Sequence, residues 1–427
     1  MKVNKGYKYR LYPTKEQEQL LKQIAGNNRF LWNQLLSINN ECREKFEETF
    51  YRYKLQDWIL YLKEQYEFLN LSYSQSLQYQ AYLLDKTIKR AFDPDMVKQR
   101  KQAIAKAREE KDEEKKKKKL AKAYNHGFPK FKKKSNFNDS ICYPQHFEIQ
   151  KEHVKLPKLG WVKYIQHRNC EGTPKLITIT QDGNQWYCSI CCEIEINEKP
   201  IQYDNVIGID LGLTDFAVFS DETHISNPRI YRKREKKVKR EQKILSRREK
   251  GSNRRKKQQL KLHKIHRSIR NQRKDFLHKL VHDMIVKYDG FVVESLAVRN
   301  MIKNHKLAKS IADVSWSDFV RILEYKCLWN SKYFEKIGRF DASTQTCSRC
   351  GNVKEMPLEQ RIYECDICGL CESRDFNSSK CMLGFSKNEE IQKRFHNNTG
   401  GTPEISYGQG EDSLELIEEL SKQTVTV

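Results

Sequence analysis

The segment Val206-Ile207-Gly208-Ile209-Asp210-Leu211-Gly212 sets one carboxylate inside an otherwise apolar run. Such a run predicts a buried strand, in which an unpaired charge costs free energy unless something neutralises it. A divalent cation would neutralise it. Because a single aspartate in a strand is more often a turn or capping residue, Asp210 becomes a candidate metal ligand only if further acids join it.

Two further acids stand at the ends of predicted elements. Glu294 ends a short apolar strand that begins at Phe291, and Asp375 opens a predicted helix. The order Asp, Glu, Asp matches nucleases in which two metal ions, roughly 4 Å apart, activate a water and stabilise the leaving oxygen of a phosphodiester. Ligands that are all oxygen favour Mg²⁺ or Mn²⁺. The sequence therefore predicts Asp210, Glu294 and Asp375 as catalytic metal ligands.

A second metal site is predicted from two Cys-x-x-Cys knuckles, each followed by glycine. The four cysteines are Cys347, Cys350, Cys365 and Cys368. Their spacing predicts a closed four-sulfur Zn²⁺ site, which is structural and stabilises its module by on the order of 10 kcal/mol. Cys371 could compete as a ligand but is expected to be a bystander. Cys188 and Cys191 repeat the spacing within a predicted strand, where residues three apart face opposite sides and cannot share an ion.

The composition points to a nucleic-acid partner. Eighty Lys and Arg against 56 Asp and Glu give a net charge of +24, concentrated at residues 115–134 and 229–274. Such an excess attracts a polyanion by releasing its condensed counterions, although a generally basic surface is the alternative. No apolar run approaches the roughly 20 residues of a membrane helix, and the start lacks a signal-peptide core. The protein is therefore expected in the cytoplasm, where its cysteines indicate metal rather than disulfides.

The periodicity of the N-terminal half changes along the chain. Residues 7–12 alternate as a half-buried strand, residues 15–93 are predicted helices, and residues 95–123 form one long helix or a helical hairpin arm. Strands return over 140–200 and could pair with the N-terminal strand, which would make the helical block an insertion. The run Lys115–Lys119 either touches a phosphate backbone or is simply exposed.

In the C-terminal half, basic helices are predicted over about 231–288 and a further helix over about 316–333. After Lys380 the chain becomes rich in Asn, Gly and Glu, and its last residues are acidic with few aromatics. This composition predicts a disordered tail.

In these motifs and their order the chain resembles the TnpB (OrfB) family, transposon-encoded RNA-guided RuvC-type nucleases related to compact type V CRISPR effectors. The resemblance covers about residues 1–385. Its motifs are Tyr7-Lys8-Tyr9-Arg10-Leu11-Tyr12-Pro13-Thr14, Gly127-Phe128-Pro129, Gly208-Ile209-Asp210-Leu211-Gly212, Val293-Glu294-Ser295-Leu296, Ser343-Thr344-Gln345-Thr346-Cys347 and Arg374-Asp375-Phe376-Asn377. The chain departs from the family pattern in two places. In the third motif, Ser373 stands where an acid is usual and Ser378-Ser379 where two alanines are, and the arm from Asp95 to Ala123 is longer than typical.

The resemblance implies an α+β multidomain fold: a ribonuclease H-like (RuvC) α/β core with an inserted zinc ribbon, and a split small β-barrel with an inserted helical recognition lobe. The implied domains are a wedge-like β-barrel (1–15 and 140–200), a helical recognition lobe with a long basic arm (16–139), a RuvC-like nuclease domain (203–344 and 373–385), a zinc-binding target-nucleic-acid module (345–372) and the disordered tail (386–427).

The resemblance also implies a function. Asp210, Glu294 and Asp375 would cut DNA, and a guide RNA from the transposon end would direct a monomer to double-stranded target DNA beside a short recognition motif. Base pairing would then read the sequence while the protein holds backbone and shape, which suits a lysine-rich surface. The rival functions are a guided DNA-binding repressor without cleavage, a DNA transposase or recombination accessory protein, and a plain zinc-ribbon nucleic-acid-binding protein.

Overall fold

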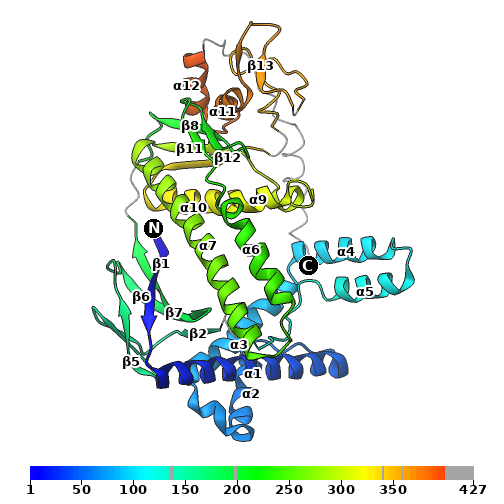
Figure 1. Cartoon of the computed structure of the whole chain (residues 1–427), viewed down its shortest axis with the longest axis vertical. Coiled ribbons are helices and arrows are strands. Elements are labelled where there is room, and N and C mark those ends of the chain that lie inside the picture. Colours follow the sequence, from blue (N-terminus) through cyan, green and yellow to red (C-terminus); the bar gives the residue numbers. More distant parts are fainter. Residues whose placement is uncertain (135–138, 197–199, 339–340, 358, 400–427) are drawn as a thin grey trace, which may run out of the picture. The chain divides into compact units, whose positions relative to one another are not determined.

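The computed structural model describes residues 1–134, 139–196, 200–338, 341–357 and 359–399 (Figure 1). The chain divides into two compact units, Met1–Ile196 and Asn197–Val427. Among the described residues, no helix has the length and apolar character that crossing a membrane requires.

The first unit is built on a seven-stranded antiparallel sheet in the order β2-β6-β7-β1-β5-β4-β3. The N-terminal strand β1 pairs with β7 on one side and β5 on the other, which confirms its predicted place in the sheet. The strands are β1 (Lys2–Tyr12), β2 (Ser140–Tyr143), β3 (Glu148–Ile149), β4 (His153–Leu156), β5 (Gly160–Ile165), β6 (Thr173–Asp182) and β7 (Gln185–Glu195). No ladder joins β2 to β3 within the described residues, so closure into a barrel stays a prediction.

Alternation along these strands decides which side chains enter the core. In β1, Tyr7, Tyr9 and Leu11 are buried. In β7, Cys188 is buried while Cys191 is partly exposed on the other face. The prediction that these two cysteines face opposite sides of the strand is therefore confirmed.

The helical block lies between β1 and β2 in the chain, as predicted. Its first helix begins at a capping box, in which the Thr14 hydroxyl accepts a hydrogen bond from the Gln17 backbone N–H and the Gln17 side chain accepts one from Thr14. Leucines and isoleucines spaced three or four apart then bury one face of each of the first three helices. The helices are α1 (Lys15–Phe46), α2 (Arg52–Gln65), the short η1 (Glu67–Leu71), α3 (Ser74–Ala91), α4 (Pro94–Arg108) and α5 (Glu113–Tyr124).

Of the two alternatives for residues 95–123, the helical hairpin is correct: α4 and α5 lie side by side (Figure 1). The helical backbone is interrupted before Asp112. The Asp112 carboxylate caps α5 by accepting a hydrogen bond from the Lys115 N–H at 3.0 Å. Only Ala107 and Ala123 are buried in the two helices. Four lysines of the run pair with acids of the same arm: Lys115 with Asp112, Lys116 with Glu113, Lys118 with Glu114 and Lys119 with Glu110.

The second unit contains a five-stranded sheet in the order β10-β9-β8-β11-β12. The first three strands are antiparallel neighbours, and β11 runs parallel to both β8 and β12. The strands are β8 (Val206–Asp210), β9 (Asp215–Phe219), β10 (His224–Ser226), β11 (Gly290–Val293) and β12 (Tyr333–Lys336). The predicted helix over 316–333 was too long: α10 ends at Trp329, because Tyr333 already begins β12.

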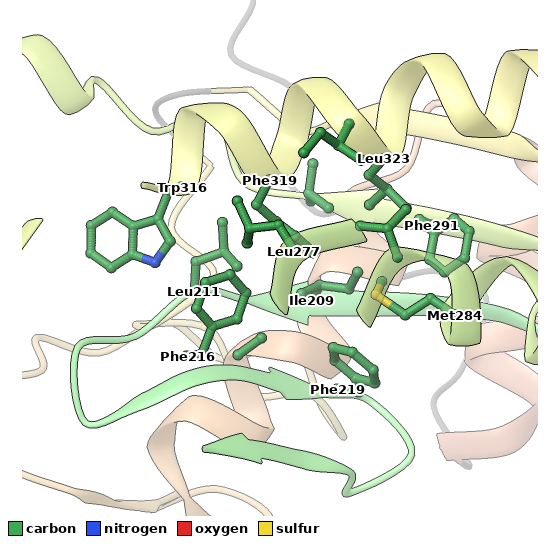
Figure 2. Packing of buried hydrophobic residues seen from close by; sticks show 14 of the residues in the cluster. Ile209, Leu211, Phe216, Phe219, Leu277, Met284, Phe291, Trp316, Phe319 and Leu323 are labelled. Atoms are coloured by element: carbon green, nitrogen blue, oxygen red, sulfur yellow. The ribbon is translucent and has the colours of Figure 1, made fainter. Parts of the chain in front are cut away.

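Helices cover one face of this sheet and form the main core (Figure 2). Leu277 and Met284 of α7 and Phe319 of α10 pack onto Ile209 and Phe291 of the central strands. The helices of this region are α6 (Ile230–Ser246), α7 (Asn253–Lys287), α8 (Val298–Met301), α9 (Ala308–Val314) and α10 (Trp316–Trp329).

The remaining elements follow α10 and β12 in the chain. A small hairpin, β13 (Ile362–Glu364) with β14 (Cys371–Ser373), leads into α11 (Arg374–Gly384), which packs on β8. The prediction of disorder from residue 386 was wrong for α12 (Glu389–Thr399), because Ile391 and Phe395 supply buried apolar contacts that the polar composition obscured. Residues 400–427 lie outside the described residues.

Candidate functional site

The first two predicted acids leave the sheet side by side. In the parallel ladder between β8 and β11, Val293 lies opposite Ile209. The next residue of each strand is an acid, Asp210 on β8 and Glu294 after β11, so both carboxylates emerge at the same edge. Asp210 is 8% exposed and Glu294 is half-buried.

The third predicted acid comes from the first turn of α11. Asp375 Oδ1 accepts hydrogen bonds from Arg374 Nε at 3.2 Å and Nη2 at 3.1 Å, and Arg361 Nη1 stands 4.0 Å from Oδ2. Because α11 packs on β8, its N-terminal turn brings Asp375 toward the end of that strand. The Glu294 carboxylate, by contrast, has no hydrogen bond or ion pair to any residue that the structure describes.

Electrostatics ties the three acids into one site. Burial raises the pKa of Asp210, and the charges of Asp375 and Glu294 add to this effect; although Arg374 partly offsets them, the pKa reaches about 8. Burial also raises the pKa of Glu294. Charge that is buried, clustered and only partly neutralised by protein cations fits a divalent cation held by oxygen ligands. The three acids predicted from separate motifs are thus neighbours.

The four predicted zinc ligands form the tightest such cluster in the described part of the chain. One sulfur atom from each lies within 4.8 Å of all the others, whereas the three acids do not form so close a group. Cys347 and Cys368 Sγ are 3.5 Å apart, as are Cys350 and Cys365. This donor set fits one tetrahedral Zn²⁺.

The two knuckles share one backbone geometry. In each, a glycine with positive φ donates its N–H to the carbonyl of the first cysteine: Gly351 to Cys347 and Gly369 to Cys365, both at 3.0 Å. Glycine adopts the left-handed backbone conformation without strain, which explains why a glycine follows each Cys-x-x-Cys pair. Burial would raise the pKa of Cys365, but backbone N–H groups of the same knuckle hold it at about 6, which favours the thiolate that binds metal.

Cys371 takes no part in this cluster. It is exposed on β14, and its sulfur lies 3.9 Å from a Glu364 carboxylate oxygen. The prediction that Cys371 is a bystander fits this position.

The zinc cluster and the acidic site are joined through Asn377, a residue to which sequence reasoning assigned no role. Its side-chain oxygen accepts the Ser348 N–H at 2.8 Å, and its amide donates to the Thr346 carbonyl at 2.7 Å. Both bonds are buried, and Asn377 lies two positions after Asp375 on α11. The knuckle that carries Cys347 is therefore fastened to the helix that carries the third acid.

Gly208 is the second residue that the sequence did not single out for a role. A Cβ there would overlap the Ser379 carbonyl oxygen and stand 3.0 Å from its carbonyl carbon. The close approach of α11 to β8 thus requires glycine on the strand. Ser378 and Ser379 fit the crowded helix face because both hydroxyls are hydrogen-bonded. The Ser378 hydroxyl bonds with Ser343 Oγ at 3.1 Å, and the Ser379 hydroxyl donates to the Phe376 carbonyl at 2.7 Å.

Comparison with known protein families gives three matches along the chain. Residues 189–305 match the OrfB_IS605 model, described as "Probable transposase", and residues 316–382 match the "Cas12f1-like, TNB domain" model. Residues 1–48 match HTH_OrfB_IS605, described as a helix-turn-helix domain. In this chain those residues form β1, α1 and the residues that follow it.

Two curated proteins are similar over most of their length. The chain is 30% identical to the "Putative RNA-guided DNA endonuclease InsQ" of Escherichia coli (strain K12), across 90% of this chain and 92% of that protein. It is 29% identical to a "Putative RNA-guided DNA endonuclease" of Streptomyces pristinaespiralis, across 89% of each. A solved Cas12f1-sgRNA-target DNA complex has a protein chain that matches with 15% identity and a TM-score of 0.43, across 88% of this chain and 98% of that one.

Proposed function

The chain belongs to the TnpB (OrfB) family, and on that premise we propose that it is an RNA-guided DNA endonuclease whose Asp210, Glu294 and Asp375 hold the metal ions for cleavage. The observation that carries the proposal is the convergence of these acids from β8, β11 and α11 into one electrostatically coupled site. A protein that only bound DNA would have no need to bury this charge.

The chain's residues would divide the work as follows. Asp210, on the central strand β8, is the most buried of the three acids and would hold metal together with Glu294 and Asp375. Two divalent cations, when bound, would activate a water and stabilise the leaving oxygen of the phosphodiester. Arg374 would lie beside the phosphate and offset its charge, because its guanidinium already reaches Asp375 and acts on Asp210.

The domain boundaries are proposed with the function. The β10-β9-β8-β11-β12 order, with three antiparallel strands followed by two parallel ones, supports a ribonuclease H-like (RuvC) core over 203–344 and 373–385. The cysteine cluster supports a zinc module over 345–372. The antiparallel sheet and its inserted helices support a wedge-like domain over 1–15 and 140–200 and a recognition lobe over 16–139.

The proposed partners are a guide RNA and double-stranded target DNA. Helices α6 and α7 bury few residues and carry a dense series of lysines and arginines, which suits binding of a phosphate backbone without base recognition. We propose that one protein chain acts with one RNA.

The test is to produce the protein together with DNA flanking its own locus, purify it, and sequence the RNA that accompanies it. A discrete RNA with a constant structured part and a variable end supplies the guide for a plasmid-cutting assay in Mg²⁺. We expect Asp210→Asn and Asp375→Asn to bind the target and leave it uncut, while Asp366→Asn, at an exposed acid of the zinc module, cuts normally.

Two results would reject the proposal. Equal cutting by Asp210→Asn and the unchanged protein would remove the metal assignment. Target binding by the unchanged protein with no cutting in Mg²⁺ or Mn²⁺ would favour the guided repressor instead.

A further inference from the structure

A cavity of about 430 Å³ opens directly beside Glu294. Its size lies within the range of pockets that hold a small ligand or one nucleotide unit. Three segments of the second unit form its walls: the loop after β11 into α8, the first turns of α10, and the end of β12. The lining residues are Glu294, Ser295, Leu296, Ala297, Val298, Trp316, Ser317, Val320, Arg321, Glu324 and Lys336.

The inner wall of this cavity is apolar and includes one aromatic ring. Trp316 lines it together with Val320 from the next turn of α10 and Leu296 from the facing loop. Trp316 is 3% exposed and belongs to the main core, at one end of the packed cluster (Figure 2). A rigid indole held by the core gives this part of the cavity wall a fixed shape, so little side-chain entropy is lost when a ligand packs against it.

Trp316 also carries an unused hydrogen-bond donor. Its Nε1 is buried and has no hydrogen-bond partner among the described residues. Buried polar groups are nearly always paired, so an unpaired donor on a residue that lines the cavity points to a ligand that supplies an acceptor. The edge of a nucleobase offers such acceptors.

The rim of the cavity carries cations. Arg321 pairs with Asp318 at 3.0 Å and Lys336 with Glu324 at 2.9 Å, and all four side chains are well exposed. Exposed ion pairs of this kind contribute little free energy, so either cation can turn to a phosphate at low cost. The cavity therefore combines an apolar interior with charged groups at its mouth, as binding of a nucleotide requires.

We propose that this cavity holds the base of the nucleotide next to the bond that is cut, with Trp316 as the residue that positions it. The inference rests on the proposed function, because Glu294 is both a proposed metal ligand and part of the cavity wall. When a phosphate of a DNA strand lies at the three acids, the base next to that phosphate is within reach of the cavity. Seating that base fixes the strand along its length and sets which phosphate faces the acids.

The experiment removes bases from the substrate one at a time. The guide-loaded protein cuts a series of targets, each with one abasic nucleotide at a different position around the cut site, in Mg²⁺. For the unchanged protein we expect one position next to the cut at which the cutting rate falls about tenfold, because the strand is no longer fixed there by a base in the cavity. Positions farther away should cut at the normal rate.

Protein variants then assign the effect to the cavity. Ser317→Trp places a large side chain at the exposed mouth of the cavity, and its matched control is Ala312→Trp, at an exposed position on α9 outside the lining. We expect Ser317→Trp to cut the intact target at the rate of the abasic one and to lose sensitivity to the missing base. Ala312→Trp should keep both the rate and the sensitivity.

Trp316→Phe tests the donor while preserving the packing of the core. We expect Trp316→Phe to move the cut by one nucleotide or to lower the cutting rate of the target that is abasic at the sensitive position. Its unfolding temperature should stay near that of the unchanged protein. A flat series of abasic targets, or equal profiles for Ser317→Trp and Ala312→Trp, would overturn the cavity assignment while cutting itself continued. Failure of the unchanged protein to cut any intact target would instead reject the proposed function.

Discussion

The contact between β8 and α11 gives a sharp test of how the acidic site is assembled. In Gly208→Ala, the new Cβ would overlap the carbonyl oxygen of Ser379 and stand 3.0 Å from its carbonyl carbon and 3.3 Å from Met382 Cβ. Ordinary van der Waals contacts begin at 3.4 Å, whereas the new Cβ would stand 3.0 Å from the Ser379 carbonyl carbon. Helix α11 must therefore move away from β8 by at least 0.4 Å. Clearing the oxygen needs a displacement on the order of 1 Å.

Two effects follow from that displacement. Overpacking against backbone atoms, which cannot rotate aside, should lower the free energy of unfolding by about 1–3 kcal/mol, or roughly 2–4 °C of Tm for each kcal/mol in a unit of this size. Because α11 carries Asp375 while β8 carries Asp210, the same displacement separates the two acids. A misplacement of about 1 Å at reacting groups can lower a rate on the order of 100-fold.

The assay compares Gly208→Ala with Gly6→Ala in the guide-loaded protein. Gly6 is also a strand glycine, but a Cβ there meets no atom within 4 Å, so its replacement should leave both Tm and cutting unchanged. We expect Gly208→Ala to bind the target and to cut it about 100-fold more slowly. Cutting at the normal rate, with an unchanged Tm, would refute the idea that this close approach positions the third acid.

Two further predictions concern the second unit. Cys347→Ser should lower bound zinc from one ion per chain to nearly none and unfold the module first on heating, whereas Cys371→Ser should keep its zinc; one zinc per Cys347→Ser chain would show that the ligand set is wrong. Burial raises the pKa of Asp221, but the Tyr288 hydroxyl and the Lys287 ammonium outweigh it and lower the pKa to about 2. Above pH 4, Asp221→Asn should therefore lower the free energy of unfolding by about 1 kcal/mol, and this difference from the unchanged protein should shrink as the pH falls from 4 to 2. Urea unfolding at pH 6 and pH 3 measures the difference. An equal difference at both pH values would contradict the prediction.

Local patterns predicted most of the elements correctly. The apolar runs that end in Asp210 and Glu294 are strands, because a run of this length between turn residues has no other way to bury both faces. The helical pattern from Lys15 onward predicted the helices that begin with α1, and the spacing of each cysteine pair predicted the knuckles. In each case a few neighbouring residues contain the whole physical reason.

Elements that depend on distant partners were missed or misjudged. Strand β12 has only four residues, of which Glu335 and Lys336 are charged, and exists because β11 offers it a parallel ladder. Helix α12 has a polar composition, yet burial of Ile391 and Phe395 stabilises it. Neither partner can be recognised from the segment itself.

The sequence by itself determined the chemical inventory: three acids at the ends of apolar or helical segments, four cysteines at zinc spacing, and a basic surface suited to nucleic acid. Only the tertiary structure decided how these parts meet. It placed Asp210 and Glu294 on adjacent parallel strands, brought Asp375 to them on a helix that Gly208 lets approach, and joined that helix to the zinc knuckle through Asn377. The physical reason is that strand pairing and close packing depend on atoms far apart in the chain, whereas residue type and spacing are local.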